Sequence, residues 1–270
     1  MKKGGPAEDA VWWTQREVSG MNMLRDRVAI VTGGAQGIGR AYCSGLAREG
    51  AAVAVADISD PSSTVAEISA AGGIALGVQV DVADRRSTER MARAVHDRFG
   101  RIDVLVNNAA FFKKATVGPW LDLTDEEWDL AMAVNVRGVF LCCRAVYPYM
   151  KEAGYGKIIN IASTVAWEGI PGFLHYVASK AALVGLTRSL AREVGDDGIR
   201  VNTLAPDLIP DDEILAKQGH EVNERIVANR SLKRTQVPED MVGAALFFAG
   251  PGSDFITGQS LIVNGGLMFQ

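Results

Sequence analysis

Two side chains that could exchange a proton, Tyr176 and Lys180, stand four residues apart. They fall in a helical pattern that we expect to run from Leu174 to Val194, so they share one helix face and their ends can converge on one site. A free tyrosine has a pKa of about 10 and is a poor base near neutrality, but a nearby ammonium favours its phenolate. The spacing therefore predicts a tyrosine that Lys180 makes acidic enough for acid–base chemistry.

Ser163 and Asn135 are the other polar residues that we expect at this site. Ser163 precedes Tyr176 by thirteen residues and follows a strand pattern, Lys157–Ile161, at the end where sites form in parallel sheets. Its hydroxyl could hydrogen-bond a substrate oxygen and stabilise developing charge there. Asn135 lies in a long helical pattern, Glu126–Tyr149, which we expect to break near it. Loops and helices can thus gather four polar side chains around one crevice.

A glycine-rich segment from Thr32 to Gly39 directly follows the first strand pattern and leads into a helical one. Glycines let the backbone turn sharply and approach a pyrophosphate, and a helix N-terminus offers unpaired N–H groups to its charge. The spacing, Gly33-x-x-x-Gly37-x-Gly39, differs from the commoner G-x-G-x-x-G. The placement between strand and helix therefore predicts a dinucleotide-binding turn, and a bare turn is the alternative.

Asp57 ends the second strand pattern, eighteen residues beyond Gly39, where dinucleotide-binding folds hold the adenosine ribose. A carboxylate there accepts hydrogen bonds from the ribose hydroxyls and repels a 2′-phosphate, and neither Gln36 nor Ile58 supplies a compensating positive charge. The sequence therefore favours NAD over NADP. In the alternative interpretation, Asp57 only caps the turn that follows its strand.

Short β-branched runs alternate with longer helical patterns from Val28 onward, which is typical of βαβ units and a parallel sheet. The predicted strands are Val28–Thr32, Ala52–Asp57, Ala75–Val80, Val104–Asn107, Lys157–Ile161, Arg200–Leu204 and Leu261–Val263. The predicted helices are Ile38–Glu49, Pro61–Ala71, Ser87–Phe99, Glu126–Tyr149, Leu174–Val194 and Pro238–Ala249. Most strands are apolar throughout, as strands covered on both faces must be. We expect one α/β domain over residues 23–270, preceded by a mobile extension, residues 1–22.

Composition narrows the class of protein further. A formal charge of −4 provides no basic field for nucleic acid, and 48% hydrophobic residues allow a large core. The three cysteines, Cys43, Cys142 and Cys143, lack metal-binding spacing, so we expect no metal. The N-terminal residues lack the apolar run of a signal peptide, and we find no apolar window of about 18 residues that could span a membrane. We expect a cytoplasmic protein that acts on small molecules.

The chain resembles the short-chain dehydrogenase/reductase family, and the resemblance spans residues 24 to 270. The motifs that carry it occur in order: the Thr32–Gly39 turn, Asn107-Asn108-Ala109-Ala110, Asn135, Ser163 and Tyr176-x-x-x-Lys180, with Asp81-Val82 beside them. The resemblance implies a single Rossmann-type domain with a doubly wound, seven-stranded parallel sheet and helices on both faces. It also implies a homo-oligomer, usually a tetramer, that transfers hydride between a nicotinamide cofactor and an alcohol or carbonyl group.

The resemblance also implies roles for single residues. Tyr176 removes the hydroxyl proton in oxidation and returns it in reduction, Lys180 also binds the nicotinamide ribose, and Asn135 holds a water that relays protons. Asp81 and Val82 contact the adenine, although Asp81 could instead cap the following helix. The expected cofactor-binding residues are Gly33, Gln36, Gly37, Ile38, Gly39, Asp57, Ile58, Asp81, Val82, Asn108, Ala109, Ala110, Tyr176, Lys180, Pro206 and Ile209.

One loop departs from the family pattern. Pro206 is followed by Asp207, where the family usually has glycine, and Asp211 stands where a threonine normally contacts the nicotinamide carboxamide. Backbone groups near Leu208 and Ile209 remain to reach the carboxamide. The loop from Asp207 to Glu213 carries four carboxylates, which would disfavour an anionic substrate if they face the pocket. A solvated acidic run is the alternative.

The expected substrate pocket is apolar, which predicts a hydrophobic, aryl or cyclic secondary alcohol or ketone as substrate. A 3-oxoacyl or sugar-alcohol dehydrogenase on the same scaffold is one alternative, and a non-catalytic protein that senses NAD is another. His175 points about 100° away from its neighbour Tyr176 on the helix, so we expect it to line the pocket or pack rather than act on the same atom. The expected pocket residues are Phe111, Val165, Trp167, Phe173 and His175.

Overall fold

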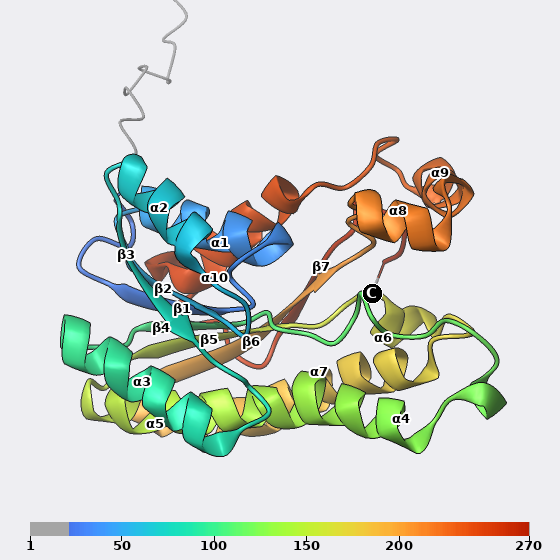
Figure 1. Ribbon diagram of the computed structural model, residues 1–270. Coiled ribbons are helices and arrows are strands. Elements are labelled where there is room, and N and C mark those ends of the chain that lie inside the picture. Colours follow the sequence, from blue (N-terminus) through green and yellow to red (C-terminus); the bar gives the residue numbers. More distant parts are fainter. Residues whose placement is uncertain (1–21, 270) are drawn as a thin grey trace, which may run out of the picture.

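Seven parallel strands form one sheet in the order β3-β2-β1-β4-β5-β6-β7 (Figure 1). The computed structural model describes residues 22–269, so residues 1–21 of the predicted extension lie outside it. The strands are β1 (Val28–Thr32), β2 (Ala52–Asp57), β3 (Ile74–Gln79), β4 (Val104–Asn107), β5 (Gly156–Ile161), β6 (Ile199–Pro206) and β7 (Ser260–Val263). All seven strands that the sequence predicts are therefore present, and the doubly wound α/β fold is confirmed.

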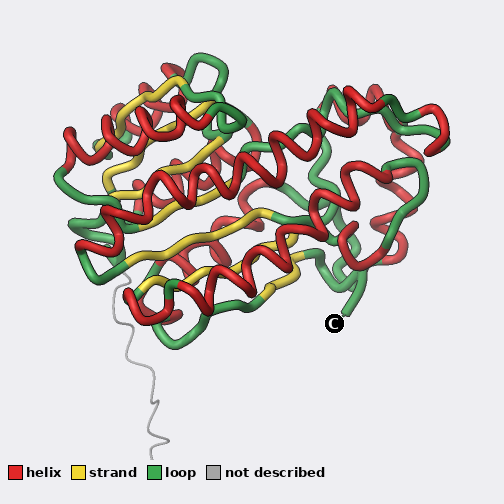
Figure 2. The backbone as a smooth tube through the Cα atoms, turned by 90° about the horizontal axis from the view of Figure 1, so that it is seen from below, coloured by secondary structure: helices red, strands yellow, loops and turns green. Residues whose placement is uncertain are grey.

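Helices cover both faces of the sheet. The main helices are α1 (Gly37–Arg48), α2 (Ser62–Ala70), α3 (Arg85–Phe99), α4 (Asp125–Met132), α5 (Gly138–Glu152), α7 (Leu174–Glu193) and α10 (Val242–Ala249). Helices α1, α2 and α10 lie on one face of the sheet, and α3, α5 and α7 lie on the other. Figure 2 shows the long helices lying over the strands and running roughly along them. Short 3₁₀ turns occupy Trp120–Asp122, Gly195–Asp197, Pro238–Met241 and Pro251–Ser253.

Burial of the strands follows their position in the sheet. All residues of β1, β4 and β5 are buried, and so are nearly all of β2 and β6, because helices cover them on both sides. The two edge strands, β3 and β7, are the exceptions, and their residues are exposed or half-buried. β3 is an edge strand that pairs only with β2, so its outer side faces solvent.

The order of the strands reverses at β1 and β4, which are neighbours although two strands lie between them in sequence. Connections leaving β1 and β4 therefore run to opposite sides, and a crevice opens beyond the carboxyl ends of these two strands. The glycine-rich turn follows β1, and the Asn107–Ala110 segment begins at the end of β4. The topology thus brings both motifs to one place.

A continuous helical segment of 28 residues, Asp125–Glu152, contains α4, a π-helical turn (Ala133–Arg137) and α5. The expected break near Asn135 is this π-helical turn, a feature often found at functional sites. This segment is long and apolar enough to cross a membrane, so our expectation that no window is apolar enough was wrong. Length and composition are weak evidence, because the buried core helices of other proteins pass the same test. Here α5 packs on α3, β4 and β5.

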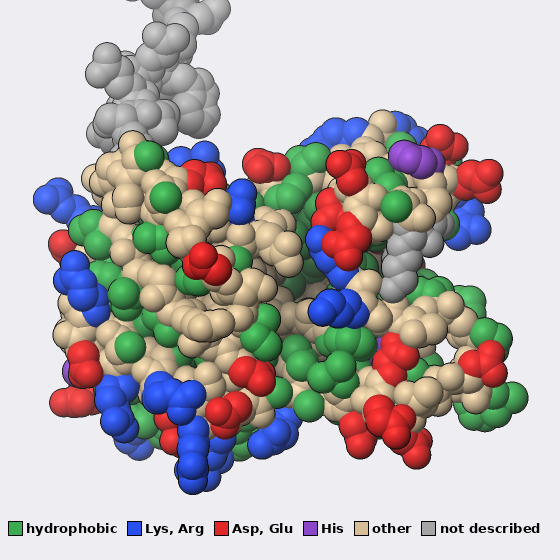
Figure 3. Space-filling view, in the orientation of Figure 1, with side chains coloured by type: hydrophobic (Ala, Val, Ile, Leu, Met, Phe, Trp, Pro, Cys, Tyr) green, Lys and Arg blue, Asp and Glu red, His purple; other side chains and the backbone are tan. Residues whose placement is uncertain are grey.

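Three further helices were not predicted: α6 (Val165–Glu168), α8 (Asp212–Gln218) and α9 (His220–Asn229). Helices α8 and α9 form a lobe beside the carboxyl ends of the strands, and Figure 3 shows a recess between this lobe and the rest of the face. No residue of α9 is buried, and its few large apolar residues, Val222, Ile226 and Val227, are half-buried.

A buried chain of polar side chains joins α7 to the sheet. The Asn107 amide donates to Asn160 Oδ1 at 2.9 Å, and the Asn160 amide donates to Thr187 Oγ1 at 2.9 Å. The Thr203 hydroxyl donates to the same Thr187 oxygen at 2.8 Å. Buried polar groups are costly unless they are paired, so this chain fixes α7 over β4, β5 and β6.

We predict that Asn160→Ala lowers the free energy of unfolding by roughly 2–4 kcal/mol, because it leaves the Asn107 amide without its oxygen partner and opens a cavity. Urea denaturation measures this change. Asn229→Ala, at an exposed helix end, is the matched control and should change stability by less than about 0.5 kcal/mol. An Asn160→Ala protein as stable as the control would show that the chain contributes nothing.

Candidate active site

The glycine turn after β1 has a shape that requires glycine. Gly33 and Gly37 adopt φ angles of +66° and +54°, in the left-handed region. A Cβ on Gly39 would lie 1.9 Å from the Gly33 carbonyl oxygen, whereas one on Gly37 would meet nothing within 4 Å. The Gln36 side chain does not cap α1, and no acidic residue occupies its first turn. The N-terminus of α1 therefore faces open space and fits a pyrophosphate.

Asn108 fixes the turn from the neighbouring strand. Its side-chain amide donates to the carbonyl oxygens of Thr32 at 3.0 Å and Gly33 at 3.1 Å. The Thr32 hydroxyl accepts hydrogen bonds from the backbone N–H groups of Asn108 and Ala109, at 3.0 and 3.1 Å. Ala110 is exposed beyond them. These contacts give Asn108 a structural role, and its expected position beside the adenosine ribose stays a prediction.

Asp57 lies at the end of β2, where it joins the glycine turn. Its carboxylate accepts hydrogen bonds from the N–H groups of Ala35 and Ser59, both at 2.9 Å. Asp57 thus caps the turn after its strand, as the alternative interpretation states. Each carboxylate oxygen still has a second lone pair that can accept a hydrogen bond from a ribose hydroxyl. Arg40 also reaches the turn, because its guanidinium donates to the Ala35 carbonyl at 3.0 Å. Ile58 is largely exposed at the rim.

Asp81 and Val82 follow β3. Asp81 accepts a hydrogen bond from the Ala83 N–H at 2.9 Å, within its own turn. The N-cap of α3 is Asp84, which accepts from the Arg86 N–H, so the alternative that Asp81 caps this helix was wrong. Val82 is buried against Gly138 of α5.

The candidate catalytic side chains converge as the sequence predicts. Tyr176 and Lys180 are both buried on one face of α7, and the Lys180 Nζ lies 5.6 Å from the centre of the Tyr176 ring. Lys180 donates a hydrogen bond to the carbonyl oxygen of Ile161, the last residue of β5, at 2.7 Å. The hydroxyl of Ser163, just beyond β5, is hydrogen-bonded to the side chain of Tyr176.

Asn135 supports this arrangement from the π-helical turn. Its side chain accepts from the Phe111 N–H at 2.7 Å and donates to the Phe111 carbonyl at 3.2 Å. It also donates to the Ser179 hydroxyl at 2.9 Å, and that hydroxyl donates to the Tyr176 carbonyl at 2.8 Å. Asn135 therefore ties the loop after β4 to the helix that carries Tyr176.

Burial controls the charges of the Tyr176–Lys180 pair. It lowers the pKa of Lys180 from 10.5 to about 7. It also raises the pKa of Tyr176 above its ordinary value, and the hydrogen bond with Ser163 lowers it to a smaller extent. The prediction that Lys180 makes Tyr176 acidic is therefore wrong for the chain alone, because desolvation of both groups outweighs their attraction. Tyr176 is a neutral phenol there.

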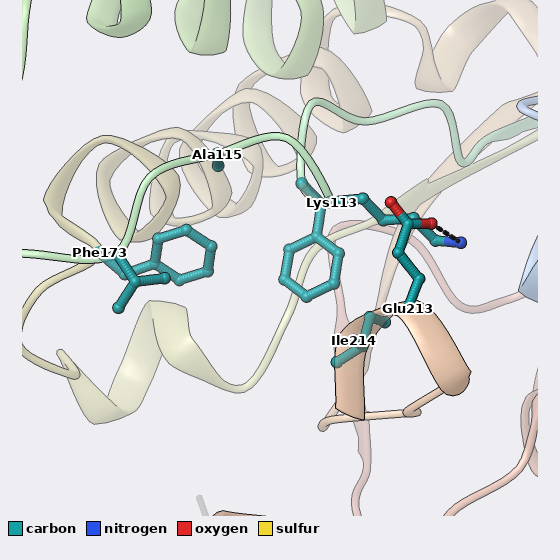
Figure 4. Close-up of a pocket in the computed structure, with 7 residues that line it drawn as sticks. Lys113, Ala115, Phe173, Glu213 and Ile214 are labelled. Carbon is teal, nitrogen blue, oxygen red and sulfur yellow. Dashed lines mark hydrogen bonds and ion pairs between the residues drawn. The ribbon is translucent and has the colours of Figure 1, made fainter. Parts of the chain in front are cut away.

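An aromatic cluster surrounds Tyr176. The Phe173 ring stacks on it at 4.7 Å, and the Phe112 ring lies against it at 5.1 Å. Beside this cluster is a small pocket, partly open to solvent, with a cavity volume of about 10 Å³. Figure 4 shows Ile214 and Phe173 on different sides of this space. The pocket is lined by Phe112, Lys113, Ala115, Val117, Phe173, Glu213 and Ile214.

Only Phe173 of the five expected pocket residues lines this space. Phe111 and Val165 pack against the aromatic cluster, and Trp167 packs against the main core. His175 is buried between Phe111 and Phe173. These four residues therefore lie outside the wall of this pocket.

His175 is directed toward α4. Its Nε2 lies 3.4 Å from a carboxylate oxygen of Glu127. Burial lowers the pKa of His175, and the charge of Glu127 opposes this shift. His175 thus has the packing role that its place on the helix favours.

Ion pairs hold the loop that departs from the family pattern. Lys113 lies 2.5 Å from an Asp211 oxygen and 3.1 Å from a Glu213 oxygen, a contact drawn in Figure 4. Asp207 is nearly buried and pairs with Arg230 at 2.6 Å. Asp211, Asp212 and Glu213 are exposed, so the alternative of a solvated acidic run holds for these three carboxylates but not for Asp207. Lys113 and Ile214 were missed because the sequence gives no sign that loops 100 residues apart meet. Within residues 22–269, no cluster of histidine, cysteine or carboxylate side chains could hold a metal.

Comparison with known proteins shows the family. Residues 33–268 match the family model described as enoyl-(acyl carrier protein) reductase. The chain belongs to the short-chain dehydrogenase/reductase family. It is 39% identical to the (2S)-[(R)-hydroxy(phenyl)methyl]succinyl-CoA dehydrogenase subunit BbsD of Thauera aromatica, over 90% of this chain and 97% of that protein.

Two other relatives show the breadth of the family. The 3-oxoacyl-[acyl-carrier-protein] reductase FabG of Thermotoga maritima is 36% identical, over 91% of this chain and 99% of that protein. The crystal structure of a putative short-chain alcohol dehydrogenase from Sinorhizobium meliloti 1021 superposes with a TM-score of 0.86 at 32% identity. That match covers 92% of this chain and 98% of the other. Family membership makes the protein an oxidoreductase, and its fold is that of a nicotinamide-dependent enzyme.

We predict that Gly39→Ala weakens NADH binding by roughly 10- to 100-fold, because the added methyl displaces the Gly33 carbonyl and reshapes the turn. Quenching of protein fluorescence by NADH gives the dissociation constant. Gly185→Ala is the matched control, since a methyl there meets nothing within 4 Å. Equal affinities in the two variants would show that the turn does not hold the cofactor.

Lys180→Met should stabilise the chain without cofactor while it abolishes turnover. The amine has a pKa of about 7 when folded and near 10.5 when unfolded, so the unfolded state binds more protons between these values. Wild-type stability therefore rises with pH across this window, and the variant lacks this dependence. We expect the variant to be more stable at pH 7 by on the order of 2–4 kcal/mol, with the gap closing toward pH 10.

Urea denaturation at several pH values between 7 and 10 measures the difference in the free energy of unfolding between the wild type and Lys180→Met. A constant difference between the two proteins would mean that Lys180 is not desolvated.

Proposed function

We propose that the protein transfers hydride between NAD(H) and a hydrophobic, aryl or cyclic secondary alcohol or ketone, with Tyr176 as the general acid and base. The observation that carries this proposal is the placement of the Tyr176 hydroxyl. It is hydrogen-bonded to Ser163, enclosed by Phe112 and Phe173, and set beyond the strand ends that also hold the glycine turn.

Each catalytic side chain has one task. Tyr176 removes the proton of the substrate hydroxyl in oxidation and returns it in reduction, while Ser163 hydrogen-bonds the substrate oxygen. When bound, the cofactor supplies the nicotinamide carbon that takes or gives the hydride, and its oxidised ring adds a positive charge that favours the phenolate. Lys180 binds the nicotinamide ribose, and Asn135 holds a water that relays the proton toward solvent.

NAD is the proposed cofactor because Asp57 places a buried carboxylate next to the glycine turn, where it repels a 2′-phosphate. Arg40 also lies beside the turn, where its guanidinium donates to the Ala35 carbonyl and the Ser63 hydroxyl. Gln36 adds no charge. We also propose a homotetramer, as the family resemblance implies, and a cytoplasmic location.

The pocket favours a neutral, aromatic substrate. Its wall is apolar except for Lys113 and Glu213, and Lys113 is shared between Glu213 and Asp211. One ammonium facing two carboxylates leaves a net negative charge at the edge of the pocket, which repels anionic ketones. The name of the relative BbsD describes a substrate with a phenyl group on the hydroxyl-bearing carbon, which agrees with an aryl pocket, although the succinyl-CoA part of that substrate is anionic.

The decisive experiment is a panel of substrates assayed with NAD(H) and NADP(H) by absorbance of the reduced cofactor. It contains acetophenone, cyclohexanone, 4-acetylbenzoate as the anionic partner of acetophenone, a 3-oxoacyl thioester and a polyol. We expect NADH with acetophenone or cyclohexanone to give the highest kcat/KM. Tyr176→Phe should lower kcat by roughly 10²- to 10⁴-fold and leave NADH affinity unchanged.

Other outcomes would replace the proposal. Preference for the thioester or the polyol would assign one of the other dehydrogenase activities, and better turnover with NADPH would refute the Asp57 argument. NADH binding without turnover of any compound would indicate a sensor. Full activity of Tyr176→Phe would remove the proposed mechanism.

A further inference from the structure

A buried ion pair lies beside the candidate active site. Arg230 follows α9, and Asp207 follows β6; their side chains are only 1% and 8% exposed. The guanidinium donates to one Asp207 oxygen from Nη2 at 2.6 Å and from Nε at 3.2 Å. It also donates to the carbonyl oxygens of Leu208 at 3.2 Å and Arg234 at 3.0 Å. One side chain thus holds two separate loops.

Stability alone is a poor reason for such a pair. Removing two charges from water costs several kcal/mol per ion, and apolar residues of similar volume often stabilise a protein as well or better. The guanidinium nevertheless has most of its donors matched to oxygens of defined position. A pair of this kind specifies the conformation of the backbone that it touches, here the segment Asp207–Leu208.

The pair is connected to the catalytic serine. The Thr164 hydroxyl donates to the second Asp207 oxygen at 3.4 Å, and the Thr164 N–H donates to the Pro206 carbonyl at 2.9 Å. Thr164 is the neighbour of Ser163. Arg230 and Asp207 therefore lock the loop after β6 against the turn that carries Ser163.

This loop borders the nicotinamide end of the cofactor. Hydride transfer requires the nicotinamide to meet the substrate carbon next to Ser163 and Tyr176, whereas the pyrophosphate lies at the glycine turn after β1. The backbone of Leu208 and Ile209 follows directly from the locked segment. Its N–H and carbonyl groups are therefore held beside the place that the carboxamide must occupy.

We propose that Arg230 and Asp207 are positioning residues for the nicotinamide end of the cofactor. They do not contact it; they fix the Leu208–Ile209 backbone in the conformation that receives the carboxamide. The inference rests on nicotinamide binding, which is common to the family, and not on the proposed substrate or on the preference for NAD. It also gives a physical role to the aspartate that stands where the family usually has glycine.

The test compares NADH with ADP-ribose, which lacks only the nicotinamide, on wild type and Asp207→Asn. Titration calorimetry gives both dissociation constants, and the fluorescence of bound NADH reports the surroundings of the nicotinamide. We expect Asp207→Asn to weaken NADH binding by roughly 10- to 100-fold and to return its emission toward that of free NADH, with ADP-ribose affinity unchanged within about twofold.

A purely structural role predicts a different pattern. If Asp207→Asn weakens the binding of NADH and ADP-ribose equally, or changes neither dissociation constant, the proposal is overturned. If Asp207→Asn does not fold, Arg230→Lys decides by the same comparison, because it keeps the charge but loses the planar donor geometry. Glu89→Gln removes an exposed Arg85–Glu89 pair on α3 and is the matched control, in which nothing should change. These are binding measurements, so failure of the substrate panel would not affect them.

Discussion

The enclosure of Tyr176 and Lys180 between α7 and the carboxyl end of β5 is the constraint on which the rest of the site depends. Both groups lose most of their contact with water, and each has a defined polar partner: the Ile161 carbonyl for Lys180 and the Ser163 hydroxyl for Tyr176. In the chain alone, desolvation keeps Tyr176 neutral and lowers the pKa of Lys180 to about 7. Their chemistry therefore depends on what is bound beside them.

The order of the strands supplies the second half of the site. Because β1 and β4 are neighbours, the glycine turn lies next to Asn108, whose side chain fixes its carbonyl groups. The same end of the sheet carries Ser163 after β5 and Asp207 after β6. A long cofactor can thus lie across the strand ends, with its phosphates at one helix N-terminus and its reactive ring near Tyr176.

Local patterns in the sequence were sufficient for the sheet and for the catalytic residues. Buried strands such as β1 and β5 are continuous apolar runs, and the four-residue spacing of Tyr176 and Lys180 needs only a regular helix to bring them together. The α8–α9 lobe was not predicted, because its few fixed contacts, such as that between Lys113 and Glu213, join residues far apart in sequence.

The same limit applies to the pocket and to the charges. The wall of the pocket combines residues from 112–117 with Phe173 and residues of α8, so no single segment has an apolar pattern that marks the pocket. The pKa of Tyr176 was predicted with the wrong sign, since its spacing from Lys180 gives their proximity but not their burial. The sequence pattern therefore predicts which residues meet, and the surrounding packing determines their protonation.

The most direct test is the ionisation of Tyr176 with and without NAD⁺. The absorbance of ionised tyrosine, measured as wild type minus Tyr176→Phe across a pH titration, isolates this one group. We predict no ionisation of Tyr176 below a pH of roughly 10 in the chain alone, and a shift to lower pH by about one unit or more when NAD⁺ is bound. Ionisation of Tyr176 at the same pH in both states would contradict a tyrosine whose acidity depends on the bound cofactor.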